Sequence, residues 1–398
     1  MLIVIKIETS ISFRALDKEM LILSEFISSI DETPCNTTIT NWILKIGYYE
    51  LTKPKIKATD WIILLDHSIQ IGNQKVLVVY GVRQSELKFD RALQYKDLTT
   101  LTIVSKTKWT GQDVADEIIK LEKDLGKIIY AIGDYGGNIK KGLKICEIKH
   151  IHDLTHWMAL SVENLYKNDE KYLSFSLKMS ELRSKCLQSD IAHIIPPKQR
   201  KKSFYQNIKT ISDWAVKSLQ FLERENKNAK TYIKEKENLM WLKDYEGFIY
   251  ELDSINQTIC EIEKVLKTKG LSTETIKTCN SILNLSKLNK SEKGKKLKPM
   301  ILNYLRQTLQ LVPQNESLLC TSDILESAFG KYKNYVNSNP MACVTNLILS
   351  LAAFTCSLTE QEITKAIEKT KIKDIKKWTE DNIGKSVLKN RTIMLSAA

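Results

Sequence analysis

The strongest pattern in the chain is a pair of apolar runs, residues 61–65 and 76–80, joined by the turn-forming segment Ile71-Gly72-Asn73-Gln74. Each run is apolar without interruption, which is typical of strands buried on both faces of a sheet. Asp66 directly follows the first run, and a carboxylate in such a setting is costly to bury unless a positive charge meets it. The pattern therefore predicts a buried β-hairpin that carries a metal-binding aspartate.

Strands and helices alternate after this hairpin. We predict a third strand at 97–105, a helix from Thr110 or Gly111 to 125, a fourth strand at 127–133, a short helix at 139–145, a fifth strand at 147–151 and a helix at 154–166. The first three strands have short links and should form an antiparallel meander, while the later ones should add in parallel through crossover helices. This is the topology of the ribonuclease H-like fold, in which strand ends bring Asp66 together with Asp134, the residue after the fourth strand.

The N-terminal region, residues 1–57, has the pattern of a small helical unit. Apolar residues recur at helical spacing over 13–30, and Pro34-Cys35-Asn36 interrupts the pattern before Thr37 or Thr38 can cap a second helix at 39–48. Two helices before a Lys-Pro-Lys linker are compatible with a DNA-binding helix-turn-helix, although short helix pairs also occur in many other proteins.

From 154 to about 313 the pattern is almost entirely helical, with apolar repeats every three and four residues over 204–222 and 239–266. Trp241 and Tyr245 in this region could stack on a flipped base, but such aromatic residues more often pack between helices.

Two basic segments, 198–202 and 290–298, are predicted as loops between these helices. The alternative to a binding role is a solvated, flexible loop in each case. Two prolines precede the first segment, and we therefore expect its Arg200, Lys201 and Lys202 to contact phosphate.

A late helix is predicted from Thr321 or Ser322 through the segment DILESAFGKYKNY. Leu325, Phe329 and Tyr332 form its core stripe. Glu326 and Lys333 share a second line about a quarter-turn away, since seven residues are almost two helical turns. The helix can therefore pack on the sheet and present a carboxylate to it. Beyond it, residues 341–358 are predicted as a buried core helix and 358–398 as a helical tail.

The composition favours a polyanionic partner. The chain has 398 residues, 43% of them apolar, and a net charge of +13, which suits nucleic acid better than a membrane surface because no basic amphipathic anchor stands out. A Lys-rich proteome would give the same charge. No run reaches the roughly 18 apolar residues of a membrane span. Eight cysteines without a CxxC pair suit a reduced, cytoplasmic location.

Histidines near the fifth strand have three readings. Cys146, His150, His152 and His156 could form a zinc cluster, but their spacing matches no standard zinc site. Asp153 and His156 could instead position a carboxylate or the scissile phosphate, or serve only to begin the helix at 154.

Four segments together resemble a bacterial insertion-sequence transposase of the DDE class: D-x5-DH at 60–67, IGDYGGN at 132–138, HDLTHW at 152–157 and SDILESAFGKYK at 322–333. The resemblance extends from the N-terminal helices to about residue 357. Families with this Glu-to-Lys spacing usually place Tyr and Arg where this chain has Leu319 and Ser322, which leaves the subfamily open.

The resemblance implies a ribonuclease H-like catalytic domain at 58–157 and 316–357, separated by a helical insertion at 158–315. It further implies Asp66, Asp134 and Glu326 as catalytic, metal-binding residues, with Mg²⁺ or Mn²⁺ as the cofactor. Lys333, together with Lys331, would contact DNA phosphate. The implied activity is strand cleavage and strand transfer at transposon ends by a homodimer in the bacterial cytoplasm or nucleoid.

Two alternatives stay open at this point. One is a ribonuclease H-like nuclease or resolvase without strand transfer. The other is a catalytically silent or truncated transposase derivative that still binds DNA.

Overall fold

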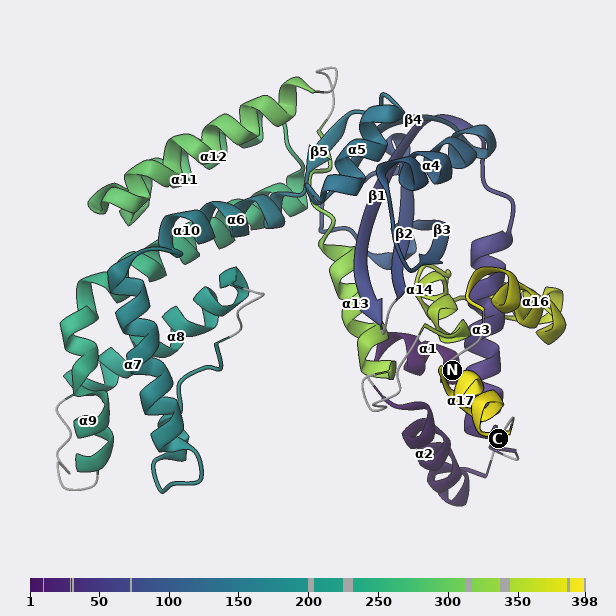
Figure 1. The fold of residues 1–398 in the computed structure, drawn as a ribbon, viewed down its shortest axis with the longest axis horizontal. Helices are drawn as coiled ribbons and strands as arrows, with labels where there is room; N and C mark the ends of the chain where they lie inside the picture. The colour runs from purple at the N-terminus through teal and green to yellow at the C-terminus, as the bar shows by residue number, and fades with distance from the viewer. Residues whose placement is uncertain are drawn as a thin grey trace. The chain divides into compact units, whose positions relative to one another are not determined.

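The computed structural model describes residues 1–9, 11–28, 30, 32–71, 74–199, 204–224, 232–311, 317–336, 344–384 and 387–396. The chain divides into two compact units. Unit 1 comprises Met1–Lys88, Ala92–His152 and Thr321–Ala398, and unit 2 comprises Phe89–Arg91 and Asp153–Cys320. Figure 1 shows the elements of both units.

Unit 1 contains a mixed five-stranded sheet in the order β3-β2-β1-β4-β5. Its strands are β1 (Ala58–Ile71), β2 (Gln74–Arg83), β3 (Thr99–Lys106), β4 (Gly126–Gly133) and β5 (His150–His152). β1 pairs antiparallel with β2 and β2 with β3, whereas β4 joins β1 and β5 joins β4 in parallel. This order and these directions confirm the predicted meander with parallel additions, the topology of the ribonuclease H-like fold.

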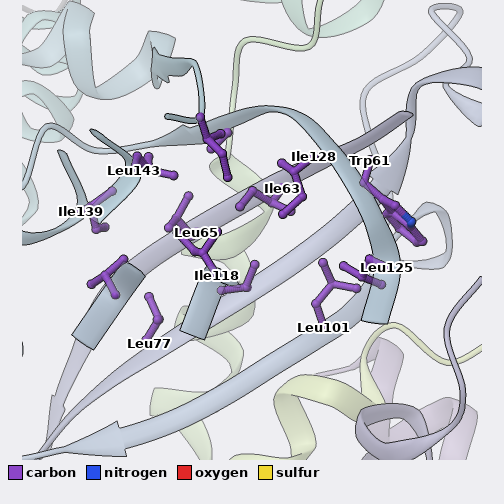
Figure 2. Packing of buried hydrophobic residues seen from close by; sticks show 14 of the residues in the cluster. Trp61, Ile63, Leu65, Leu77, Leu101, Ile118, Leu125, Ile128, Ile139 and Leu143 are labelled. Atoms are coloured by element: carbon purple, nitrogen blue, oxygen red, sulfur yellow. The ribbon is translucent and has the colours of Figure 1, made fainter. Parts of the chain in front are cut away.

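One face of the sheet carries the main apolar core. The alternating residues Trp61, Ile63 and Leu65 of β1 pack against α4 (Gly111–Leu125) and α5 (Gly137–Ile145), whose inward side chains include Ile118 and Leu143. Figure 2 shows these side chains meeting above the strands. Capping is local here, since the Thr110 side chain accepts a hydrogen bond from the Asp113 backbone at the start of α4.

The opposite face is covered by later parts of the chain. The hydroxyl of Tyr80, a fully buried residue of β2, donates to the carbonyl of Leu351 at 2.8 Å. The hydroxyls of Thr100 and Thr355 lie 2.9 Å apart. α13 (Asp323–Val336) packs against β1, and Figure 1 shows it running beside that strand. Ile62 and Leu64 therefore lie on this second face, because side chains alternate along a strand.

The N-terminal region holds α1 (Leu2–Glu8), α2 (Phe13–Phe26) and α3 (Asn36–Thr52). α1 was not predicted. Its buried Lys6 lies between the rings of Phe13 and Tyr335, at 4.3 Å and 3.7 Å from their centroids. α2 is shorter than the apolar pattern over 13–30 predicts, and its last apolar residues are exposed, so their spacing is not a core stripe.

The C-terminal region of unit 1 contains η6 (Asn346–Leu349), α14 (Ser350–Ala353), α15 (Glu360–Lys369), α16 (Ile372–Asn382) and α17 (Val387–Ser396). The prediction of one buried helix over 341–358 is wrong for the described part of that range. Most residues of this described part are buried, but they form a 3-10 turn and one short helical turn instead of a single helix. The Thr345 hydroxyl accepts from the Leu347 backbone and starts this tighter turn.

Unit 2 is helical. Its elements are α6 (Leu154–Tyr166), α7 (Glu170–Cys186), η3 (Ala192–Ile194), α8 (Phe204–Glu223), α9 (Ile233–Leu239), η4 (Met240–Tyr245), α10 (Glu246–Lys269), α11 (Thr273–Leu285), η5 (Lys287–Lys290) and α12 (Glu292–Gln310). The apolar repeat over 239–266 is not one helix, since η4 precedes α10. The basic segment 290–298 is not a loop either, because Ser291 caps α12 and most of the segment is helical.

Candidate active site

Two aspartates belong to neighbouring parallel strands, since Asp66 lies within β1 and Asp134 directly follows β4. The register between β1 and β4 pairs Leu64 with Ile132 and Leu65 with Gly133. Asp66 is the residue after Leu65 in β1, and Asp134 is the residue after Gly133 at the end of β4, so each follows a member of the last pair of this ladder. The observed register is compatible with the predicted approach of Asp66 and Asp134, and their joint site stays a prediction.

Asp66 is buried, with 9% of its surface exposed. Its carboxylate Oδ1 accepts a hydrogen bond from the backbone N–H of His67. The pairing with β2 is regular up to Asp66–Val78 and shifts before Ile69–Val76. Such a bulge bends the strand and redirects its side chains, a device that often lies next to active sites.

Asp134 is held by the loop that follows it. Its Oδ1 accepts from the backbone N–H of Gly136 at 3.0 Å, and α5 begins at Gly137. A Cβ atom on Gly136 would lie 2.8 Å from this same oxygen. Glycine at this position therefore lets the backbone approach the carboxylate closely, and a larger residue would displace the Asp134 side chain or the loop.

His67 is a residue of this site that the sequence pattern did not single out. It is buried, its ring centroid lies 4.8 Å from that of Trp109, and its Nε2 has no hydrogen-bond partner among the described residues. The pKa of His67 is lowered to about 4, mainly by burial and less by the Lys75 ammonium, while the Asp134 carboxylate opposes both effects. A neutral imidazole thus lies within the electrostatic reach of Asp134. Its adjacency to Asp66 was the only available sequence signal.

The histidines of β5 pack against an aromatic ring. The ring of Tyr135 lies 5.0 Å from that of His150 and 4.0 Å, edge-on, from that of His152. Burial lowers the pKa of His150. Within the described ranges, no set of three or more His, Cys, Asp and Glu side chains is placed to hold a metal ion. The zinc cluster of Cys146 and the three histidines is therefore not formed in this structure.

Glu326 lies in the first turn of α13, as predicted, on the helix that packs against β1. Asp66, Asp134 and Glu326 consequently belong to the same compact unit. Among the described residues, these three carboxylates are also not placed together in a way that could hold a metal ion. Asp66 lies in β1, Asp134 directly follows the neighbouring strand β4, and the helix of Glu326 packs against β1.

The basic residues that we predicted to contact DNA phosphate lie in different environments. Lys333 is exposed on α13. Lys331 donates to the carbonyl of Ile7 at 3.1 Å and lies 4.8 Å from the centroid of the Tyr95 ring. Arg200, Lys201 and Lys202 lie outside the described residues.

A second face of α13 borders a cavity of about 620 Å³, and Asp323, Ser327 and Lys331 are among the residues that line it. The Ser327 hydroxyl accepts a hydrogen bond from the Tyr95 hydroxyl at 2.8 Å there. None of Asp66, Asp134 and Glu326 lines this cavity, so its volume is no argument for the catalytic site.

Asp153 and His156 belong to unit 2 and begin α6. The Asp153 side chain accepts from the His156 backbone at 2.8 Å, and the Nδ1 atom of His156 lies 3.1 Å from the same oxygen. This geometry is that of an N-cap with a ring beside it. In the same unit, Trp241 and Tyr245 pack on Phe175 with ring centroids 5.5 Å and 5.4 Å away, which is the helix-packing arrangement.

No protein-family model matches the chain, and no curated protein matches it. Among solved structures, it is similar to the Drosophila P element transposase strand transfer complex, with a TM-score of 0.37 and 13% sequence identity over 83% of this chain and 87% of that one. A similarity at this level does not assign a function. No helix of the described part is long and apolar enough to cross a membrane.

Proposed function

We propose that this protein is a DNA transposase that cleaves and transfers DNA strands at the ends of a mobile element. The observation that supports the proposal is the parallel register of β1 and β4, which runs to the Leu65–Gly133 pair directly before Asp66 and Asp134 in a ribonuclease H-like sheet. Phosphodiester chemistry of this kind uses divalent cations held by hard oxygen ligands, and carboxylates supply them.

The chemistry of the two aspartates fits Mg²⁺ or Mn²⁺. Asp66 lies on the central strand of the sheet, where the His67 N–H and burial fix its carboxylate. Asp134 is oriented by the Gly136 N–H. When bound there, the cation would supply Lewis-acid chemistry, activating a water or 3′-hydroxyl and stabilising the leaving oxygen.

We assign Glu326 as the third carboxylate from its place on α13. Because the described side chains form no three-ligand set, the proposal requires Glu326 to join the aspartates when metal and DNA are bound. Three carboxylates that converged without a cation would repel one another and raise their pKa values, which gives a physical reason for their separation before binding.

DNA is the proposed partner. The net charge of +13 favours a polyanion, and Lys333 is exposed on the helix of Glu326. We further propose that the N-terminal helices contribute to end recognition, and that a homodimer brings two transposon ends together.

The proposal is tested by cleavage and strand-transfer assays on DNA carrying the element's own ends. Asp66→Asn, Asp134→Asn and Glu326→Gln should each reduce metal-dependent cleavage by about a thousandfold, because several kcal/mol of transition-state stabilisation are lost. DNA binding in EDTA should stay near the wild-type level. Asp124→Asn, a change of an exposed aspartate on α4, is the matched control and should retain activity.

Full activity in any one of the three variants would remove that residue from the site. Cleavage without strand transfer in the wild type would instead identify a nuclease on the same fold.

A further inference from the structure

Lysines gather around one cavity of unit 2. The cavity has a volume of about 370 Å³, within the range of ligand sites, and its walls include Lys171, Lys287, Lys290, Lys293, Ser254 and Ser291. Glu251 is the carboxylate among its lining residues. The ammonium groups of Lys171, Lys287 and Lys290 around one small cavity repel one another, so the arrangement favours an anion between them.

The cavity lies at the start of a long helix. Ser291 caps α12, and its hydroxyl accepts from the Gly294 backbone at 3.0 Å. A Cβ atom on Gly294 would lie 2.1 Å from the carbonyl oxygen of Leu288. Glycine at this position therefore lets the first turn of α12 pack on η5, which carries Lys287 and Lys290. The positive end of the helix dipole adds to the field of the lysines.

The charges of the site are only partly neutralised. The Lys293 ammonium lies 2.7 Å from Asp169 and 3.6 Å from Glu251, and Glu251 also accepts from the Tyr166 hydroxyl at 2.9 Å. The Lys293 charge is therefore shared between two carboxylates, and the remaining positive charge of the cavity comes from Lys171, Lys287 and Lys290. Burial and the Asp213 carboxylate raise the pKa of Asp253, and the nearby Lys287 ammonium partly offsets this rise. Lys171 and Lys290 are exposed and take part in none of the ion pairs of the described residues.

We propose that this cavity binds a phosphate group, either from a nucleic-acid backbone or from a free polyphosphate. Three features of phosphate recognition meet there: several ammonium groups, hydroxyl groups and a helix N-terminus. Tyr250 also lines the cavity and is 40% exposed, so its ring is accessible to a base or sugar attached to the phosphate.

A neighbouring cavity is lined by carboxylates, which do not favour phosphate binding. It also includes Tyr250 and Lys287, but it carries the carboxylates of Asp253 and Glu261. A phosphate is repelled by two carboxylates, so the proposed site is confined to the side of α10 that faces Lys171 and Lys290.

The cavity lies within unit 2, so binding of phosphate to it can be measured independently of DNA cleavage. The variant Lys171→Ala/Lys290→Ala is compared with Lys277→Ala/Lys296→Ala, which removes the same charge from exposed positions of α11 and α12 outside the cavity. All four lysines are exposed, so both variants should fold, which circular dichroism checks. The full chain is used in EDTA, which prevents metal-dependent cleavage.

Two binding measurements distinguish the sources of the phosphate. Calorimetry with inorganic pyrophosphate should show binding that the cavity variant weakens by about tenfold or more, because charged hydrogen bonds are lost. Anisotropy with a short DNA duplex over a salt series should show a dependence on log salt that is smaller by about 0.9 for each lysine that contacts a phosphate.

Loss of pyrophosphate binding in the cavity variant alone supports a site for a free polyphosphate. A smaller DNA salt dependence in that variant alone, without pyrophosphate binding to the wild type, supports a backbone site. If the two variants are indistinguishable in both measurements, the proposal is overturned. Loss of cleavage on mutation of Asp66 has no bearing on this result, so the two proposals fail separately.

Discussion

Gly136 offers a sharp test of how the loop after β4 holds its carboxylate. The backbone of Gly136 has φ −52° and ψ 131°, a conformation that alanine also adopts. A Cβ atom would nevertheless lie 2.8 Å from the Asp134 Oδ1 atom, below any ordinary contact. Gly136→Ala should therefore act through the carboxylate and not through backbone strain.

The expected size follows from the contact that is lost. The Gly136 N–H donates to the Asp134 carboxylate at 3.0 Å, and a hydrogen bond to a charged group contributes about 1.5–3 kcal/mol. The added methyl group should push the loop away from Asp134 and remove much of the stabilisation that this hydrogen bond contributes. Gly137→Ala is the matched control, since a Cβ atom there meets nothing within 4 Å. It should be neutral or slightly stabilising, because alanine favours the first turn of α5.

Urea unfolding at neutral pH compares the stability of the two variants, and a metal-dependent cleavage assay compares their activity. Gly136→Ala should lose both stability and activity relative to Gly137→Ala. Equal stability and equal activity in the two variants would refute the view that this glycine orients Asp134.

Three further predictions follow from other contacts. Because the pKa of His67 is about 4 in the folded protein against 6.5 in the unfolded chain, the unfolded chain takes up the proton first as pH falls, and about 2 kcal/mol of stability should be lost between pH 6.5 and 5. His67→Gln should remove that part of the pH dependence in urea unfolding, and an unchanged pH dependence would contradict the assignment. Tyr80→Phe should cost about 1–3 kcal/mol, since the buried carbonyl of Leu351 loses its donor; no change in the urea midpoint would mean that water replaces the donor. Asp153→Ala should cost about 1 kcal/mol by removing the cap of α6, and Asp153→Asn should restore it. Loss of cleavage in a fully stable Asp153→Asn would instead give this residue a role in catalysis.

The sheet was predictable because its strands are encoded locally. Buried strands need uninterrupted apolar runs, and the turn at 71–74 and the cap at Thr110 have their own chemistry. Strand direction then followed from the lengths of the links. The positions of Asp66 and Asp134 came with the strands, since each residue directly follows an apolar run.

The helical parts were less predictable because an apolar repeat does not record where a helix breaks. The pattern over 239–266 runs through a 3-10 segment, and the lysines at 290–298 appear as a loop although Ser291 caps a helix there. The exposed apolar end of α2 and the buried Lys6 of α1 depend on tertiary packing. His67 received no role from the sequence for a similar reason, because its environment is set by Trp109 and Asp134, far from it in the chain.

Metal binding by the full chain tests the central claim most directly. Thermal unfolding is compared with and without Mg²⁺ for the wild type, Asp66→Asn and the control Asp124→Asn. If the aspartates of β1 and β4 hold a cation, Mg²⁺ should raise the unfolding temperature of the wild type and of the control and leave that of Asp66→Asn unchanged, because a ligand stabilises the state that binds it. A wild-type unfolding temperature that does not respond to Mg²⁺ or Mn²⁺, or an equal shift in Asp66→Asn, would contradict the account.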